Sequence, residues 1–218
     1  MKNLSFRLFK LIGGLFLYSL GIIITIKANI GYSPWDIFHV GLAQTFDISI
    51  GTASILTGLI IGIITILLGE KLGLGTILNM VCIGIFIDIL IKLNFIHKST
   101  SFPVGILMMI LGLFIIAFAS YFYINSSFGA GPRDSLMVAL SRKTKLPVGL
   151  CRGSIEIIAL LCGWKLGGMV GVGTILSAFC IGFCIQLTFK VLKFDVSTVK
   201  HETLKDTFNS FGSLKQKL

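Results

Sequence analysis

The chain has 218 residues, of which 55% are hydrophobic and only 13% are charged. This composition lies well outside the range of soluble domains and indicates an integral membrane protein. The formal net charge of +10 fits cationic loops and tails that face anionic lipid, so it gives no support to nucleic-acid binding.

The first half contains three apolar segments, each close to the length that crosses a bilayer. They run over Leu11–Ile26, about Ile50–Leu68 and about Leu74–Ile91. The first resembles a signal peptide, but it has a counterpart in mid-chain, which a removable leader would not need. Residues 33–46 are too short to span, and Pro34 suits a first helical turn, so an interfacial or re-entrant helix is predicted there.

The second half repeats this plan. Spans are predicted at about 104–124, 148–164 and 169–189, with a short helix at 132–144. We therefore divide the chain into a first transmembrane repeat, a second transmembrane repeat and a polar cytosolic tail. These three parts cover residues 1–98, 99–192 and 193–218.

An internal duplication underlies the two halves. The pattern G-x-x-P-x-D occurs at Gly31–Asp36 and again at Gly129–Asp134, 98 residues later. At this offset 24 of 86 positions match between Arg7–Lys92 and Gly105–Lys190, where composition alone would give roughly 7. Shared glycine and proline at fixed spacing indicate shared backbone geometry and close packing. The residues assigned this structural role are Pro34, Pro132, Gly75, Thr76, Gly173 and Thr174.

The number of spans predicts how the halves are oriented. Three spans per half is an odd number, so the second half must be inverted relative to the first. This arrangement places 14 Lys and Arg residues on one side and 4 on the other, with Arg152 inside a span. The bias predicts that both termini lie in the cytoplasm. If the short helices crossed fully, each half would have four spans and the repeat would be parallel.

The expected fold is therefore an all-α integral membrane fold of six transmembrane helices. It comprises two inverted three-helix repeats, each with a short interfacial or re-entrant helix. The glycine-rich duplication resembles the YczE/YitT group of bacterial membrane proteins, and its YczE-like branch most of all. The resemblance covers about residues 7–192 and implies a multi-pass protein of the bacterial cytoplasmic membrane, without implying a substrate or a reaction. It rests on Gly31, Pro34, Asp36, Gly129, Pro132, Asp134 and the two Gly-Thr-Ile-Leu runs that begin at Gly75 and Gly173.

A central solute site is the chemistry that this plan favours. In transporters with inverted repeats, polar backbone from interrupted helices meets near the middle of the bilayer. Helix N-termini after Pro34 and Pro132 would suit an anion, although Asp36 and Asp134 can instead cap those termini themselves. The candidate substrate-binding residues are Gly31, Ser33, Asp36, Gly129, Gly131, Asp134, Arg152 and Glu156.

Arg152 and Glu156 are charged residues inside a predicted span, where charge is costly. Their spacing of four places them on one helix face, as a structural ion pair or as part of a solute or proton site. Arg152 also lies near the predicted cytoplasmic end, so its side chain has the length to snorkel toward the interface.

The sequence favours no enzyme. No nucleophile has a base at a defined spacing, and there is no phosphate loop or zinc motif. All five cysteines lie in apolar segments without histidine partners, so neither a metal nor a cofactor is expected. The expected partners are the lipid bilayer and a small solute or ion, and not nucleic acid.

Three functions remain open at this point. The first is a small-solute or ion transporter with a site between the repeats. The second is a non-transporting accessory protein that modulates a membrane-associated enzyme or complex. The third is the solute-binding subunit of a multi-component transporter. A continuous polar cavity between the halves would favour the first or third, and a packed interior with an exposed basic patch would favour the second.

Overall fold

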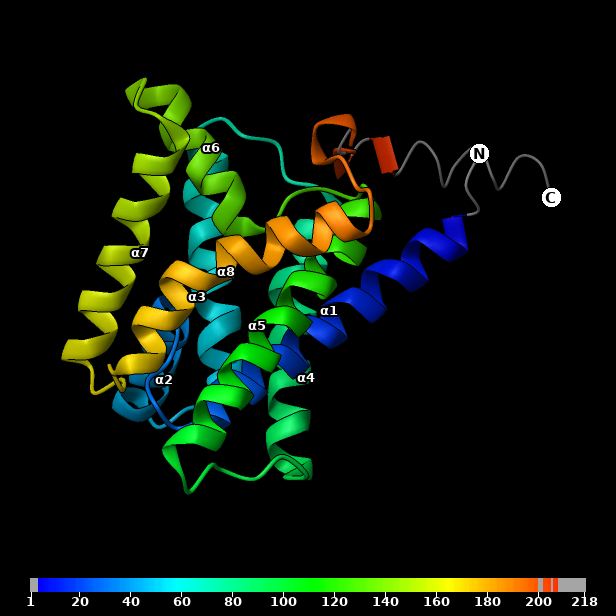
Figure 1. Cartoon of the computed structure of the whole chain (residues 1–218). Helices are drawn as coiled ribbons and strands as arrows, with labels where there is room; N and C mark the ends of the chain where they lie inside the picture. Colours follow the sequence, from blue (N-terminus) through cyan, green and yellow to red (C-terminus); the bar gives the residue numbers. More distant parts are fainter. Residues whose placement is uncertain (1–3, 200–201, 205, 208–218) are drawn as a thin grey trace.

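The regular elements of the protein are helical wherever the computed structural model describes them, which is over residues 4–199, 202–204 and 206–207. They are α1 (Leu4–Lys27), α2 (Pro34–Phe46), α3 (Ile50–Leu67), α4 (Leu74–Leu93), α5 (Phe102–Asn125), α6 (Pro132–Thr144), α7 (Val148–Lys165), α8 (Val172–Val191) and the short 3-10 helix η1 (Val196–Thr198). Figure 1 shows them in one bundle.

Five of the helices are long and apolar enough to cross a membrane, namely α1, α3, α4, α5 and α8. They coincide with five of the six predicted spans. Helix α7 has the same length as α3, 18 residues. It carries Arg152, Glu156 and Lys165, and it is not among the five. That α7 is a sixth span stays a prediction.

The two halves have the same helix boundaries. Each of α5 to α8 begins and ends 98 residues after its counterpart among α1 to α4. The backbone of the connections also recurs, because Gly31 and Gly129 have φ angles of 113° and 121°, and Gly69 and Gly167 have 88° and 93°. Only glycine adopts such angles readily. The duplication in the sequence is thus a duplication of backbone geometry in the described residues.

The equivalent helices α1 and α5 lie side by side and run antiparallel. Near the start of α1, Arg7 Nε donates to the carbonyl oxygen of Ser126, just past the end of α5, at 3.0 Å. At the opposite end, the backbone N–H of Ser99 donates to the carbonyl oxygen of Lys27 at 2.8 Å. Helix α1 also packs on α4, and α5 packs on α8 in the same way, which builds the apolar core.

The halves are joined by two reciprocal backbone contacts. The N–H of Gly75 donates to the carbonyl oxygen of Phe128, and the N–H of Gly173 donates to that of Ile30, both at 2.7 Å. Each glycine begins a Gly-Thr-Ile-Leu run, and each acceptor lies just before a G-x-x-P-x-D motif of the other half. Every motif is therefore packed against the opposite repeat.

Close glycine contacts make this docking possible. A Cβ atom built on Gly31 would lie 2.6 Å from the backbone nitrogen of Gly171, and one built on Gly129 would lie 2.8 Å from Cα of Gly73. Thr76 Oγ1 adds a bond of 2.6 Å to the carbonyl oxygen of Ala130. These contacts give Gly31 and Gly129 a structural role in addition to the one predicted.

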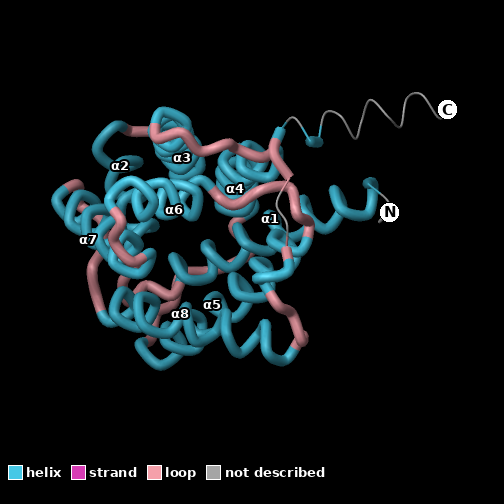
Figure 2. The backbone as a smooth tube through the Cα atoms, turned by 90° about the horizontal axis from the view of Figure 1, so that it is seen from above, coloured by secondary structure: helices cyan, strands magenta, loops and turns pink. Residues whose placement is uncertain are grey.

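The halves differ where the third and fourth helices of each meet. Helices α3 and α4 pack closely, and a Cβ built on Gly84 would lie 2.5 Å from the carbonyl oxygen of Gly51. The equivalent Gly149 and Gly182 have no atom within 4 Å of such a Cβ. Helices α7 and α8 diverge from their connecting turn, and both views place α7 beside α2 and α6 (Figures 1 and 2).

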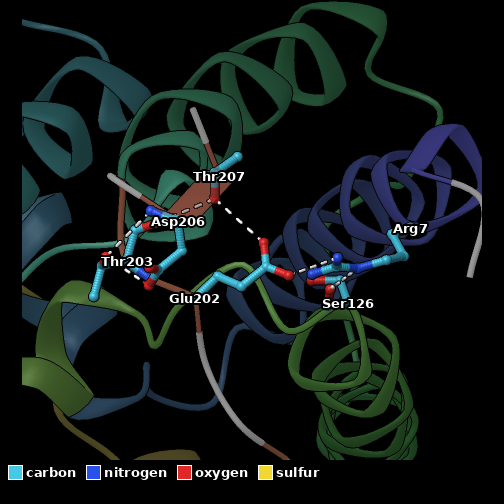
Figure 3. A network of polar contacts seen from close by, with 6 residues as sticks. All are labelled: Arg7, Ser126, Glu202, Thr203, Asp206 and Thr207. Atoms are coloured by element: carbon cyan, nitrogen blue, oxygen red, sulfur yellow. Dashed lines mark hydrogen bonds and ion pairs between the residues drawn. The ribbon is translucent and has the colours of Figure 1, made fainter. Parts of the chain in front are cut away.

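The chain beyond α8 returns to the start of α1 (Figure 3). Glu202 forms an ion pair of 2.7 Å with Arg7, and its backbone N–H donates to Ser127 at 2.9 Å. Hydrogen bonds from Thr203 hold the pKa of Asp206 below its usual value. Most of the tail predicted at 193–218, including all of 208–218, lies outside the described residues.

Candidate functional site

A cavity of about 380 Å³ lies between the two halves. Helices α1 to α4 line it from the first repeat, and α5 to α8 line it from the second. We call it the polar cavity, because its wall includes Ser54, Asn79, Tyr123, Asp134 and the pair Arg152 and Glu156. Its volume falls in the usual range of small-molecule sites, about 300–1,000 Å³.

The cavity brings together half of the predicted binding residues. Gly131, Asp134, Arg152 and Glu156 line it. The other four predicted residues, Gly31, Ser33, Asp36 and Gly129, are not among its lining residues. All four lining residues come from the second repeat, so the two copies of the motif stand in different relations to the cavity.

The first copy of the motif caps its own helix. Ser33 is the N-cap of α2, and its Oγ accepts from the backbone N–H of Asp36 at 3.4 Å. The same hydroxyl donates to Asp36 Oδ2 at 2.5 Å, and the Asp36 side chain is buried. Ser33 is therefore the capping side chain, and the buried carboxylate of Asp36 bonds to that cap and not to a backbone N–H in any hydrogen bond between the described residues.

The second copy lacks this cap, because Gly131 occupies the position equivalent to Ser33. Asp134 is exposed on the cavity wall. A Cβ built on Gly131 would lie 3.3 Å from Tyr123 Oη and 3.5 Å from Asp134 Oδ2. The absence of a side chain at Gly131 thus leaves room beside two polar groups.

Tyr123 supplies a buried hydroxyl to this space. Its residue is 4% exposed, and Oη has no hydrogen-bond partner among the described residues. Leaving a buried donor unpaired costs about 1–3 kcal/mol. The hydroxyl is thus an unpaired polar group of a residue that lines the cavity.

Arg152 and Glu156 form the predicted pair, with Nε and Oε1 3.0 Å apart. Their side chains are 50% and 31% exposed, and both line the cavity. Ser54 and Gly58 hold the equivalent positions in α3 and also line it. Equivalent positions of the two repeats therefore line the cavity with different charge.

Sequence reasoning missed the aromatic and cationic cluster at the junction of α2 and α6. The guanidinium of Arg133 lies over the ring of Trp35, with Cζ 4.3 Å from the centroid. His39, which is buried, lies beside the same ring at 6.3 Å between centroids. Both His39 and Trp35 line the cavity. Because Trp35 and Arg133 hold equivalent positions, the repeat itself was the available signal.

The described residues hold no cluster of three or more His, Cys, Asp or Glu side chains arranged to bind a metal ion. The cavity wall offers several groups that can bind a solute. It provides guanidinium and carboxylate charges, a phenol, an amide and an indole face around one hollow.

Comparison with known proteins places residues 5–190 in one family, described as a family of unknown function (DUF6198). An uncharacterized membrane protein of Bacillus subtilis, YczE, is 38% identical over 178 residues, covering 80% of this chain and 81% of its own. An uncharacterized protein of Haemophilus influenzae is 31% identical over 191 residues, covering 88% and 85%. No solved structure matches the chain.

Proposed function

Since the chain belongs to the DUF6198 family, whose function is unknown, we propose a function from the geometry of its cavity. The protein is a membrane protein. Its relative YczE is described as one, and five of its helices are long and apolar enough to cross a membrane. We infer that it is a permease of the bacterial cytoplasmic membrane that moves a small solute or ion through the polar cavity. We assign it no catalytic role.

The proposal includes an inverted arrangement of the two halves. It is supported by the antiparallel course of α1 and α5, and by the reciprocal contacts of Gly75 with Phe128 and of Gly173 with Ile30. The distribution of Lys and Arg favours both termini in the cytoplasm. Inverted repeats of this kind form solute sites where the halves meet.

The observation that carries the proposal is the polar cavity itself. It lies between the halves, its lining comes from both, and it holds the unpaired hydroxyl of Tyr123 together with Asp134 and the pair of Arg152 and Glu156. Ionisable groups within a membrane are costly and are found where they face water, a substrate path or one another.

The cavity also bears on the alternatives. An accessory protein would use the exposed basic turn at Lys143 and Lys145 as a docking surface, and would have no need of a polar hollow in its interior. A solute-binding subunit would use the same cavity and would borrow its energy from another chain. The permease and the subunit differ in whether the cavity opens to both sides.

Cysteine accessibility tests this difference. The five native cysteines are replaced by alanine, and Asp134→Cys is treated with a membrane-impermeant maleimide in right-side-out and in inside-out vesicles. Two exposed controls identify the two sides: Lys98→Cys, in the loop before α5, and Lys143→Cys, in the last turn of α6 beside the next loop. Thr65→Cys, which is fully buried and does not line the cavity, sets the background.

A permease exposes its site to each side in turn, so Asp134→Cys is expected to react in both vesicle preparations and more slowly than the loop controls. Reaction from one side alone would overturn the permease and favour the binding subunit. Reaction as fast as Lys143→Cys, from that side alone, would favour the accessory protein.

A further inference from the structure

A second hollow of about 800 Å³ lies between α2, α3, α6 and α7. We call it the apolar groove, because side chains such as Phe38, Leu42, Ile60 and Ile158 line it almost throughout. The apolar face of α2 thus lines this groove. The groove is larger than the polar cavity and has the opposite character.

The groove and the polar cavity share part of their walls. Four residues line both hollows, namely Trp35, Thr57, Ile61 and Ile155. The apolar space and the charged space are therefore neighbours, and these four residues face both. Arg133 lies at the boundary, with its guanidinium on the ring of Trp35.

We propose that the polar cavity and the apolar groove form one binding site for an amphiphile, with its acyl chain in the groove and an anionic head group in the cavity. The inference rests on the permease proposed above and names the substrate class of that same site. Arg133 is the residue assigned to contact the head group.

The chemistry of Arg133 favours an anionic head group. A guanidinium binds carboxylate or phosphate through paired hydrogen bonds and keeps its charge under all physiological conditions. Asp134 and Glu156 line the same cavity and would repel a head group of high negative charge. A singly charged carboxylate or phosphodiester therefore fits better than a phosphomonoester.

The shared wall of the two hollows is what distinguishes this ligand from others. A water-soluble solute would use the cavity and leave the groove without a purpose. Bulk lipid would fill the groove without any need for it to meet Arg133 and Trp35. An amphiphile uses both hollows at once, and its size matches two spaces that each fall within the range of ligand sites, about 300–1,000 Å³.

Photolabelling of the full chain tests the proposal. The protein is reconstituted in phosphatidylcholine vesicles with a fatty acid that carries a diazirine in its chain, and labelled peptides are located by mass spectrometry. Unlabelled palmitate, lysophosphatidylglycerol, lysophosphatidylcholine and glycerol 3-phosphate serve as competitors. Palmitate and lysophosphatidylglycerol distinguish a carboxylate from a phosphodiester head group.

A matched pair of variants reports on the groove. Ile60 and Ile63 lie on α3, and both are 59% exposed, but only Ile60 lines the groove. Ile60→Trp is expected to fill the groove and reduce labelling of α3 and α7 about tenfold, while Ile63→Trp leaves it within about twofold. Arg133→Gln is expected to remove the preference for anionic competitors, about tenfold, without blocking the groove.

Three results would overturn the inference. They are labelling spread evenly over all lipid-facing helices, equal effects of Ile60→Trp and Ile63→Trp, and competition by glycerol 3-phosphate as effective as that by lysophosphatidylglycerol. The accessibility of Asp134→Cys, measured in the same vesicles, separates the two proposals. Access from both sides with failed labelling rejects the amphiphile alone, whereas access from one side rejects the permease.

Discussion

Arg133 and Trp35 hold the same position in the two copies of G-x-x-P-x-D, and they lie against each other, with Arg133 Cζ 4.3 Å from the centre of the indole ring. The contact joins the first turn of α2 to the first turn of α6. A cation on an aromatic face away from water is stabilised by up to about 2 kcal/mol. This pair therefore ties the two halves together at the wall of the cavity.

A double-mutant cycle should detect this coupling. Trp35→Leu, Arg133→Gln and the double variant are expected to give a coupling free energy of about 1 kcal/mol or more, measured by denaturant unfolding in mild detergent. Lys10 and Phe6 form a similar contact at 4.7 Å on an exposed part of α1, and their cycle should give less than about 0.5 kcal/mol. Equal values for the two cycles would contradict a special role for the half-buried pair of Trp35 and Arg133.

Two equivalent glycines should respond differently to alanine. Gly84→Ala brings a methyl group to 2.5 Å from the carbonyl oxygen of Gly51, so it should lower the free energy of unfolding by about 1–3 kcal/mol. Gly182→Ala meets no atom within 4 Å and should be neutral or stabilising by up to about 1 kcal/mol, because alanine favours helix. Thermal unfolding of both variants decides the matter. A similar loss at Gly182 would mean that α7 and α8 pack together in the membrane.

The glycines that begin the two motifs should tolerate no side chain. Gly31→Ala and Gly129→Ala each force a left-handed φ on alanine and a clash with the glycine of the opposite half. We expect each to cost more than about 2 kcal/mol, measured as folded yield and midpoint of unfolding. Gly13→Ala, where no atom lies within 4 Å, is the matched control. If Gly31→Ala behaved like Gly13→Ala, the docking of the halves would not depend on these contacts.

Arg7 should matter more than its ion-pair partner. It pairs with Glu202, donates to the carbonyl oxygen of Ser126 and lies over the ring of Phe128, with Cζ 4.4 Å from the centroid. Arg7→Gln loses most of these contacts and should cost about 2–3 kcal/mol, whereas Glu202→Gln should cost about 1 kcal/mol or less because its partner keeps the other two. Unfolding midpoints of the two variants test the order. The reverse order would mean that Glu202, in the tail, contributes more to stability than Arg7.

Local signals explain how well the helices could be predicted. Hydropathy marks the apolar helices, Pro34 and Pro132 mark helix starts, and the turn glycines mark helix ends. All of these are local signals, so the predicted segments lie close to the observed ones. The sequence did not predict that α7 diverges from α8. Gly149 and Gly182 match Gly51 and Gly84 residue for residue, and what separates the pairs is packing against distant helices.

The site was predictable where charge had to be accommodated. Arg152 and Glu156 stood out because ionised groups are costly in apolar segments, and Asp134 stood out because it belongs to the repeated motif. All three line the cavity. Tyr123 did not stand out, because an aromatic residue in a lipid-facing helix and one aimed at a cavity look alike in sequence. Asp36 and Asp134 have different environments because Ser33 bonds to Asp36, whereas the equivalent Gly131 has no side chain to bond to Asp134. The effect of this substitution is seen only in the folded turn.

The exchange of contacts between the halves also determines when the first motif can complete its fold during synthesis. The carbonyl oxygen of Ile30 receives its hydrogen bond from Gly173, a residue that is synthesised only after most of the second half. Until Gly173 is in place, the carbonyl oxygen of Ile30 lacks the partner that it has in the folded protein. Helix α8 therefore supplies a contact that the first motif needs. A chain that stopped before Gly171 would contain every residue of the first repeat but would lack the hydrogen bond from Gly173 to Ile30.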